Sequence, residues 1–370
     1  MKGVLPQIIA DHIVTDFIRG RNLEVGARLP TVRQIADFYQ TSVETAFGAL
    51  RVLADQGMIH CRRGSGSYVA RPYAEASCTE SRHLGLVSNV PVYDENPLAG
   101  YFQQGVRARC DMLGIKLTAE TGASGYADEK KTVRRLLKAG CKVLIISPAT
   151  RTRSQLRSDY LAKEFRDVPI VLYGFVHEEQ NRPAVLFDNR RAARLITSRL
   201  VANGYRHVVF SKLQSARDEL CHRSNEDRYD GYLDALSEFG LPPRTMDIEE
   251  AAAKEQLGEE AARWFAANRA LCDGQLAILA RDDMHARVLI AAARRAGLRL
   301  PGNLLVAGFD NLPGSPRIFP TTAPDFRMAG EMTVDIALQQ LNRPTSVACH
   351  YLLPVPILWG PDRSPHASEI

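Results

Sequence analysis

From residue 83 onward, short apolar runs alternate with longer amphipathic segments, and this alternation constrains the fold more than any other feature of the chain. The runs are typical of strands buried in a parallel sheet, and the segments are typical of crossover helices between such strands. The predicted strands span residues 84–89, 143–147, 170–175, 184–188, 207–210, 276–280 and 304–310. The predicted helices span residues 100–113, 129–139, 190–203, 226–239, 256–268, 284–296 and 328–341. So many units exceed one small domain, so we expect an α/β region of two lobes with parallel sheets.

The beginning of the chain follows a different pattern. Apolar residues at helical spacing predict helices over residues 4–19, 31–40 and 41–57, the last of them opening on Thr41 or Ser42. The short strand candidates MIHC and SYVAR follow and bracket the tip RRGSG. The order of a helix, a helix-turn-helix and a hairpin predicts a winged helix-turn-helix, which is a DNA-binding architecture.

The hairpin segment GMIHCRRGSGSYV has two possible interpretations. Its glycine-rich tip could hold the phosphates of a nucleotide, or it could be the turn of a basic wing that lies against DNA. The tip is not followed by Gly-Lys-Ser/Thr and a helix, so it is not a P-loop. We therefore expect Arg62 and Arg63 to meet DNA phosphates.

Residues 72–82 are small, polar and aperiodic, which is typical of a linker. The expected organisation is a winged helix-turn-helix domain over residues 1–71, a linker over residues 72–82, and an α/β domain over residues 83–363.

Charge and cysteine content agree with an intracellular DNA-binding protein. The net charge is only +5, but residues 1–71 carry nine Lys and Arg against six Asp and Glu. The seven cysteines are scattered without a C-x-x-C pair, which fits a reducing compartment and buried thiols that act as small hydrophobes. The first residues lack the apolar run of a secretory signal, and no run is long enough for a membrane helix. We expect a cytoplasmic protein without a membrane partner.

Motifs for catalysis or metal binding fail on inspection. The adjacent pairs Cys221-His222 and Cys349-His350 cannot easily direct both side chains at one metal. No Gly-x-Ser-x-Gly elbow follows a strand, and no strand–Lys context indicates a Schiff base. We expect neither a cofactor nor a metal, and no enzymatic activity. The acidic run over residues 247–255 is interpreted as a solvated loop or helix surface, and the arginines of residues 190–199 as the wet face of a crossover helix.

The segment LPTVRQIADFYQTSVETAFGALRVLADQGMIHCRRGSGSYV resembles the GntR-type winged helix over its whole length. The shared features are Leu-Pro-x-x-Arg at the start of the second helix, a Thr in the recognition helix, Leu-x-x-Leu-x-x-x-Gly at the end of that helix, and Arg-x-Gly-Ser-Gly-x-Tyr-Val in the wing. The resemblance implies that Arg33, Ser42 and Thr45 contact DNA and that the wing tip lies over the minor groove. The full set of DNA-binding candidates is Thr31, Arg33, Thr41, Ser42, Val43, Glu44, Thr45, Arg62, Arg63, Gly64, Ser65 and Gly66. Many members carry arginines where this chain has Val43 and Phe47, so the operator sequence is not predictable.

Residues 83–363 resemble the effector domain of LacI/GalR repressors, which share the fold of periplasmic sugar-binding proteins. The resemblance rests on HLGLVSN, LFDNRRAARLITSRLVANGYRHVVF, EDRYDGYLDAL and LARDDMHARVLIAAARRAGLRLPGNLLVAGFDN. A GntR-like head on a LacI-like body is the arrangement of the arabinose repressors, which is the most similar subgroup.

A sugar-like effector requires charged donors and acceptors at strand ends, together with an aromatic wall. By resemblance, Arg228, Asp282 and Asp310 match the effector-contacting Arg and Asp residues of the family. The alternative is that the two aspartates only cap helices or close turns. Tyr93 and Phe102 are further candidates for contact with the effector.

One departure from the family concerns the charge of the predicted pocket. Arg281 stands where many relatives have Asn, so a sugar phosphate or another anionic sugar is a second ligand class.

These features predict a homodimeric transcriptional regulator, with two winged heads on operator DNA and a sugar-like effector between the lobes of each body. The chain does not indicate whether the effector releases or recruits DNA. One alternative is the solute-binding protein of a sugar transporter, against which the head and the missing signal peptide argue. The other is a pyridoxal-phosphate enzyme fused to a GntR-like head.

Overall fold

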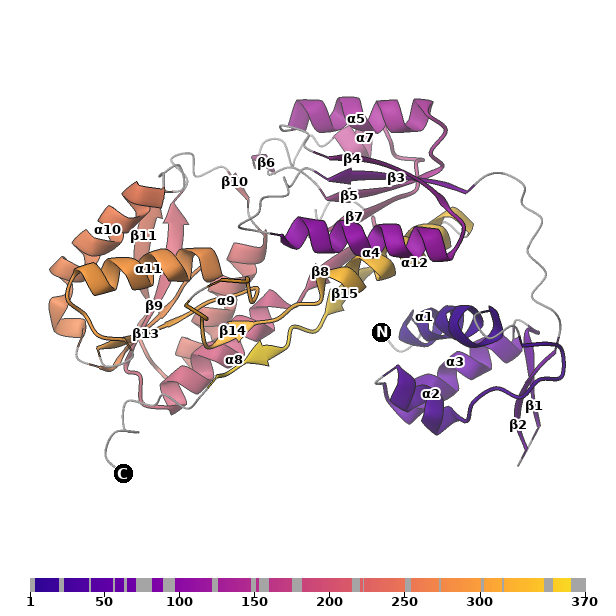
Figure 1. The fold of residues 1–370 in the computed structure, drawn as a ribbon, viewed down its shortest axis with the longest axis horizontal. Helices are drawn as coiled ribbons and strands as arrows, with labels where there is room; N and C mark the ends of the chain where they lie inside the picture. The colour runs from indigo at the N-terminus through magenta and orange to yellow at the C-terminus, as the bar shows by residue number, and fades with distance from the viewer. Residues whose placement is uncertain are drawn as a thin grey trace. The chain divides into compact units, whose positions relative to one another are not determined.

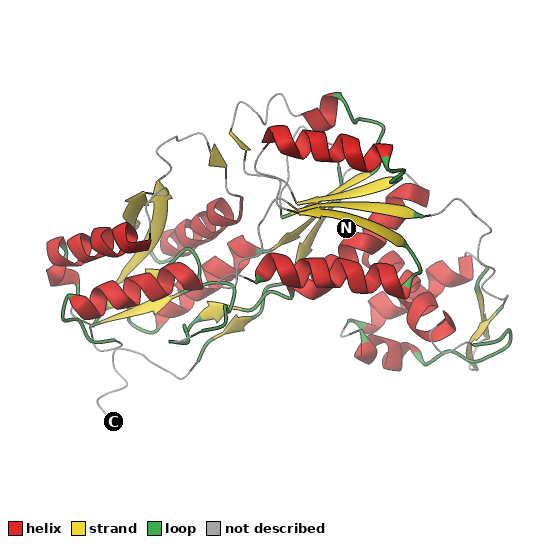
Figure 2. Ribbon diagram, turned by 45° about the horizontal axis from the view of Figure 1, so that its top comes forward, coloured by secondary structure: helices red, strands yellow, loops and turns green. Residues whose placement is uncertain are grey.

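The computed structural model divides the chain into two compact units, Met1–Ser81 and Arg82–Ile370. It describes residues 4–360 apart from residues 20–22, 40, 56, 63–64, 71–81, 89–96, 122–125, 148–150, 153–159, 175–181, 215–219, 222, 250–253, 273, 301–302, 315 and 343–348. The predicted α/β fold with a winged helix-turn-helix at its beginning is confirmed in both units (Figures 1 and 2).

The first unit contains three helices followed by a hairpin (Figure 1). Its elements are α1 (Val4–Ile13) with the π-helical turn η1 (Val14–Arg19), α2 (Val32–Phe38), α3 (Val43–Asp55), β1 (Ile59–Arg62) and β2 (Gly66–Val69). One apolar face of each helix packs into a common core, in which Ile13, Ile35 and Leu53 are fully buried. The opposite faces of α2 and α3 remain exposed, as a DNA-binding surface requires.

The second unit begins with a six-stranded parallel sheet in the order β15-β8-β7-β5-β3-β4. Its strands are β3 (His83–Ser88), β4 (Lys116–Thr121), β5 (Val143–Ser147), β7 (Ile170–Tyr173), β8 (Ala184–Phe187) and β15 (His350–Leu353). Helices α4 (Leu98–Met112) and α12 (Phe326–Asn342) cover one face, and α5 (Tyr126–Lys138) and α7 (Tyr160–Lys163) cover the other (Figure 1). This layering explains why most of these strands are apolar throughout rather than alternating.

A second parallel sheet has the order β11-β9-β12-β13. Its strands are β9 (His207–Gln214), β11 (Arg244–Glu249), β12 (Leu276–Leu279) and β13 (Leu304–Ala307). Helices α8 (Asn189–Ala202) and α9 (Arg223–Glu238) pack on one face, and α10 (Lys254–Ala267) and α11 (Asp283–Arg295) pack on the other. A short 3₁₀ turn, η2 (Arg269–Leu271), follows α10.

Two pairs of short antiparallel strands complete the unit. Strand β6 (Arg151–Thr152) pairs with β10 (Leu220–Cys221), and β14 (Thr321–Thr322) pairs with β16 (Ile357–Leu358). The β6–β10 pair joins a segment of the first lobe, built on the six-stranded sheet, to a segment of the second lobe, built on the four-stranded sheet. Because α12 and β15 return to the first sheet after the second sheet is complete, the two lobes are linked by several chain crossings.

Glycines allow two close helix–helix contacts in the second unit. A Cβ at Gly105 in α4 would lie 2.0 Å from the carbonyl oxygen of Arg327, and one at Gly330 in α12 would lie 2.2 Å from that of Phe102. A Cβ at Gly231 in α9 would likewise lie 2.0 Å from the carbonyl oxygen of Arg190 in α8. The backbones of α4 and α12, and of α8 and α9, therefore touch at these glycines.

Three sequence-based interpretations need correction. Strands β4, β11 and β15 were not predicted, and the acidic run over residues 247–255 is not a loop or helix surface throughout, since Asp247–Glu249 belong to β11. The thiol of Cys61 is exposed rather than buried, whereas Cys110, Cys141 and Cys272 are buried as expected. The arginines of α8 are exposed but not purely solvated, because Arg190 and Arg194 form ion pairs with Asp234 and Glu238 of α9.

Candidate DNA-binding surface and effector site

The N-terminal turn of the recognition helix α3 is held by the hydroxyl of Ser42. This hydroxyl accepts a hydrogen bond from the backbone N–H of Thr45 at 3.0 Å and lies 2.7 Å from the Thr45 hydroxyl. Such a cap satisfies a donor that the helix leaves unpaired and fixes where the helix begins. The side chains of Ser42, Val43 and Glu44 are exposed, while Thr41 and Thr45 are half-buried. The helix therefore presents its first turn to solvent.

The preceding helix α2 begins with a complete capping box. The Thr31 hydroxyl accepts from the backbone N–H of Gln34 at 3.3 Å, and the Gln34 side chain accepts from the backbone N–H of Thr31 at 2.9 Å. This reciprocal cap fixes the start of α2. Arg33, in the first turn of α2, is exposed. The exposed starts of α2 and α3 are thus formed by the residues that the sequence predicts for DNA contact.

The wing is the antiparallel pair β1–β2, with Ile59 opposite Val69 and Arg62 opposite Gly66. The Arg62 guanidinium lies 5.3 Å from the centre of the Tyr68 ring, and the Ser65 hydroxyl lies 2.6 Å from the Tyr68 hydroxyl. The aromatic ring thereby orders the basic end of the hairpin. Arg63 and Gly64 lie outside the described residues.

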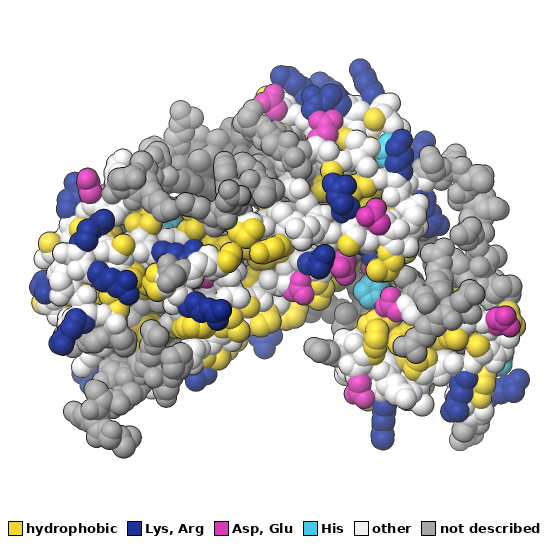
Figure 3. Space-filling model, in the orientation of Figure 1, with side chains coloured by type: hydrophobic (Ala, Val, Ile, Leu, Met, Phe, Trp, Pro, Cys, Tyr) yellow, Lys and Arg dark blue, Asp and Glu magenta, His cyan; other side chains and the backbone are white. Residues whose placement is uncertain are grey.

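Arg28 is a basic wing residue that the sequence did not reveal. Its backbone forms a bridge with Tyr68, and a Cβ at Gly66, whose φ is +119°, would lie 3.0 Å from the Arg28 Nε. Gly66 therefore leaves room for this guanidinium beside the tip, and Arg28 is itself exposed. Basic side chains gather at the hairpin end of this unit (Figure 3).

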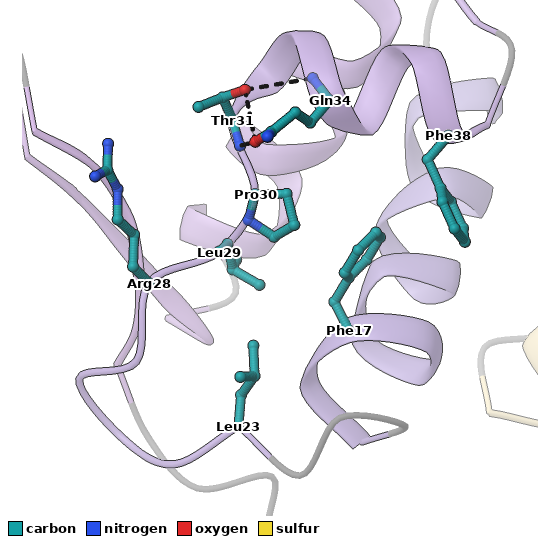
Figure 4. Close-up of a pocket in the computed structure, with 8 residues that line it drawn as sticks. All are labelled: Phe17, Leu23, Arg28, Leu29, Pro30, Thr31, Gln34 and Phe38. Atoms are coloured by element: carbon teal, nitrogen blue, oxygen red, sulfur yellow. Dashed lines mark hydrogen bonds between the residues drawn. The ribbon is translucent and has the colours of Figure 1, made fainter.

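An open groove of about 580 Å³ lies in the same unit, beside the start of α2 (Figure 4). Its lining is Phe17, Leu23, Arg28, Leu29, Pro30, Thr31, Gln34 and Phe38. Phe17 and Phe38 meet edge to face, with ring centres 5.0 Å apart. The groove is separate from the predicted effector site, whose residues all lie in the second unit.

The centre of the candidate effector site is Arg228, a buried residue of α9. Its guanidinium donates to Asp310 Oδ1 at 2.7 Å, to Asn189 Oδ1 at 2.9 Å and to the carbonyl oxygen of Arg281 at 2.6 Å. Its Cζ also lies 4.5 Å from the centre of the Phe309 ring. The structure thus brings together three predicted residues, and it adds Asn189 and Phe309.

Asp310 lies just beyond the carboxyl end of β13 in a left-handed turn. Its φ is 86° and that of Asn311 is 47°. Burial raises the pKa of the Asp310 carboxyl, an effect that the nearby Arg228 charge opposes and that the Asp282 charge reinforces. The carboxylate thus sits at the edge of the sheet where ligands bind in open α/β folds.

Asp282 both caps a helix and belongs to this cluster. Its Oδ1 accepts from the backbone N–H of His285 at 2.9 Å, which caps α11, and its Oδ2 accepts from Arg281 Nε at 2.9 Å. Burial alone would raise the pKa of Asp282, but the contacts with His285 and Arg281 outweigh it and hold the pKa below its usual range. The capping alternative therefore applies to Asp282, alongside its proximity to the charged cluster.

Of the two predicted aromatic residues, the structure describes only Phe102. Phe102 is only 1% exposed, and its ring stacks on Tyr173 with centres 3.6 Å apart, so in this structure it packs in the core of the first lobe. Tyr93 lies outside the described residues. The aromatic contacts continue from Tyr173 to Phe187 and on to Phe326.

Tyr173, at the end of β7, is close enough to Asp310 to be affected by its charge. Burial raises the pKa of its hydroxyl, and the negative charge of Asp310 raises it further. Ser88 and Ser147 end the adjacent strands β3 and β5 in register with each other.

Among the residues that the structure describes, no group of three or more His, Cys, Asp or Glu could hold a metal ion.

Comparison with known proteins supports both units. Residues 7–69 match the model of bacterial regulatory proteins of the gntR family, and residues 197–360 match that of the periplasmic binding protein-like domain. The arabinose metabolism transcriptional repressor of Geobacillus stearothermophilus is 24% identical over 307 residues, which cover 82% of this chain and 81% of that repressor. This relative is a transcriptional regulator rather than an enzyme.

Solved structures share the fold of the second unit. A putative ribose operon repressor from Burkholderia thailandensis is 21% identical, with a TM-score of 0.60 over 75% of this chain and 99% of its own. The lac repressor dimer bound to operator and the anti-inducer ONPF is 19% identical, with a TM-score of 0.62 over 78% of this chain and 95% of its own. The predicted combination of a GntR-type head and a periplasmic-binding-protein-like body is confirmed. No described helix has the length and apolar character needed to span a membrane.

Proposed function

We propose that this chain, which joins a GntR-type winged helix-turn-helix to a periplasmic-binding-protein-like domain, is a DNA-binding transcriptional regulator whose operator affinity responds to a sugar-like effector. One observation carries the proposal. The chain that exposes a capped recognition helix also buries the Arg228–Asp310 pair at the carboxyl edge of a parallel sheet. A solute-binding protein of a transporter needs only the second feature, so that alternative is disfavoured.

The proposed DNA surface combines sequence reading with phosphate contact. The start of α3, together with Thr41 and Ser42 before it, enters the major groove, and Arg33 reaches the backbone or a base edge. The wing, with Arg62 and the newly recognised Arg28, holds phosphates of the adjacent groove. Val43 and Phe47 are exposed apolar residues on α3, suited to contact with apolar base edges such as thymine methyl groups.

The proposed effector is a polyhydroxylated molecule of the sugar class. Arg228 and Asp310 offer a planar donor and a carboxylate acceptor for adjacent hydroxyl groups, and Asp282 offers a second carboxylate. Arg228 pairs with Asp310, and Arg281 pairs with Asp282. The charges of the cluster are therefore balanced, which favours a neutral sugar. Arg281 is partly exposed and bonds Asp282 through Nε, which leaves its terminal nitrogens for a sugar phosphate.

The proposed mechanism is thermodynamic linkage in a homodimer. Effector binding between the lobes changes their relative arrangement, and through the dimer it changes the spacing of the two heads on a two-fold symmetric operator. A hundredfold change in operator affinity requires a coupling free energy of about 2.7 kcal/mol. We further propose that the protein acts in the cytoplasm, without a cofactor and without enzymatic activity.

The experiment that tests the DNA-binding part is selection from a random DNA library followed by fluorescence anisotropy at several salt concentrations. The wild type is expected to enrich a two-fold symmetric sequence. Arg62→Ala and Arg28→Ala are expected to weaken binding to all sequences and to lower the slope of log Kd against log salt by about 1 each. Arg166→Ala, an exposed arginine of the second unit, serves as the matched control and should leave the slope unchanged. Equal slopes in all four proteins would refute the proposed role of the wing.

A further inference from the structure

Asp283, the first residue of α11, connects that helix to the turn that carries Asp310. Its side chain is buried, with 2% exposure. Oδ1 accepts a hydrogen bond from the Thr321 hydroxyl at 2.8 Å, and Oδ2 accepts one from the backbone N–H of Leu312 at 2.9 Å. The backbone N–H of Asp283 itself donates to the carbonyl oxygen of Phe309 at 3.0 Å. The backbone N–H and the carboxylate of Asp283 therefore tie α11 to the loop that follows β13 and to β14.

Side-chain acceptors hold every backbone N–H of this turn. Asp310 donates to the Thr322 hydroxyl at 2.9 Å, Asn311 donates to the Thr321 hydroxyl at 3.3 Å, and Leu312 donates to Asp283. The Thr321 hydroxyl has one proton, which it gives to Asp283, so its lone pairs are free to face Asn311. A left-handed conformation at consecutive non-glycine residues persists only where the surroundings enforce it. Asp283 acts on this turn directly and also through Thr321.

We propose that Asp283 is a positioning residue for effector recognition, whose carboxylate holds the turn in which Asp310 faces Arg228. The inference rests on the proposed function, because it concerns the residue expected to receive the effector hydroxyls. Asp283 has no contact of its own with the effector in this account. Its effect on recognition passes through the direction of the Asp310 carboxylate.

The charge state of Asp283 connects the turn to pH. Burial raises the pKa of its carboxyl to about 7, and the negative charge of Asp310 adds to this increase. The hydrogen bonds from Thr321 and Leu312 oppose this increase, and so does the charge of Arg287 on the next turn of α11. Thr321 and Thr322 of β14, and Phe309 and Leu312 of the loop, contribute no charge. The carboxylate consequently takes up a proton near neutral pH, and a protonated oxygen is a poorer acceptor for the hydrogen bonds of the turn.

Amide hydrogen exchange followed by NMR tests whether Asp283 holds the turn. In Asp283→Ala, the amides of Asn311 and Leu312 are expected to exchange at least about tenfold faster, while Ala307 in β13 keeps its protection. Asp283→Asn retains an oxygen acceptor, so its amide exchange rates should stay near those of the wild type. The NMR chemical shift of the Leu312 amide should, however, no longer change with pH near pH 7. Asp325→Ala removes a carboxylate that caps α12 and is the matched control. Unchanged exchange in Asp283→Ala, or an equal change at Ala307, would overturn the proposal. If Asp283→Ala does not fold, Thr321→Val replaces it, and the amide of Asn311, which donates to Thr321, is then expected to exchange at least about tenfold faster.

A thermal-shift titration with L-arabinose, D-ribose and cellobiose separates this proposal from the proposed function. For any of these sugars that raises the melting temperature of the wild type, Asp283→Ala should require about tenfold more sugar, and Asp325→Ala should not. An unchanged requirement in Asp283→Ala would refute the positioning role. If none of these neutral sugars, nor D-ribose 5-phosphate, raises the wild-type melting temperature, the proposed effector class fails, and the exchange at Asn311 and Leu312 still decides whether Asp283 holds the turn.

Discussion

Removing the charge of Asp310 should destabilise the second unit by about 3 kcal/mol, because it leaves the buried Arg228 without its counter-ion. The two side chains are only 7% and 10% exposed, and their N–O distance is 2.7 Å. Removing one partner of such a pair costs about 3–5 kcal/mol. The lower end applies to Asp310→Asn, since Asn189, the carbonyl oxygen of Arg281 and the Phe309 ring still face the guanidinium.

The pair should also be strongly coupled. Burial raises the pKa of Asp310 despite the adjacent guanidinium, which indicates that burying these charges costs free energy that the ion pair offsets. Replacing both residues, as in Arg228→Met with Asp310→Asn, should therefore destabilise the unit by about 2 kcal/mol less than the sum of the single changes.

The assay is urea unfolding followed by tryptophan fluorescence, which reports on this unit because the two tryptophans of the chain, Trp264 and Trp359, both lie in it. The control is Asp234→Asn, which breaks an exposed pair with Arg190 and should cost less than about 1 kcal/mol. The reasoning is refuted if Asp310→Asn is no more destabilising than Asp234→Asn, or if the two single changes simply add.

Three further predictions concern other parts of the molecule. The pKa of the Asp283 carboxyl is raised in the folded chain, so the folded chain binds this proton more tightly than the unfolded chain does. The contribution of Asp283 to the free energy of unfolding should therefore decrease by up to about 4 kcal/mol as pH rises from about 4 to about 7. Asp283→Asn should flatten this part of the pH profile of urea unfolding, and an unchanged profile would contradict the assignment. Gly231→Ala should destabilise the α8–α9 contact by about 1–3 kcal/mol, since the added Cβ meets backbone at 2.0 Å, and a urea midpoint equal to that of the wild type would rule this out. Ser42→Ala should lower the stability of the head by about 1 kcal/mol through loss of the α3 cap, whereas Ser42→Asn should keep the cap and the stability. The measurement is amide hydrogen exchange at the buried residues Leu50 and Leu53 of α3 in the full chain, and equal exchange in Ser42→Ala and the wild type would contradict the prediction.

The parts of the fold that could be predicted from the sequence are those with a strong periodic signal. Central strands such as β5 and β12 are apolar throughout because helices cover both faces of their sheets. The edge strand β13 is apolar throughout, but the edge strands β4 (KLTAET), β11 (RTMDIE) and β15 (HYLL) mix charged, polar and apolar residues. Their sequences therefore resemble loops, and pairing with a distant strand decides their conformation.

The candidate sites show the same division between residues with a clear signal in the sequence and residues without one. Arg228 and Asp310 were predicted because each matches a motif of the family, and Asp310 also follows the carboxyl end of β13. Thr321, Asp283 and Arg28 carry no local signal, and their roles depend on contacts with residues distant in the chain, such as the 2.8 Å bond between Thr321 and Asp283. Phe102 satisfied the local criterion for an aromatic wall, but its ring is buried against Tyr173.

The most direct test of the account is the affinity of the full chain for its selected DNA, measured by anisotropy at fixed salt with and without a sugar that raises its melting temperature. The account predicts a change in Kd of about tenfold or more, equivalent to a coupling free energy of about 1.4 kcal/mol or more, which is lost in Asp310→Asn. An affinity that is the same with and without the bound sugar would contradict the claim that this protein is an effector-responsive regulator.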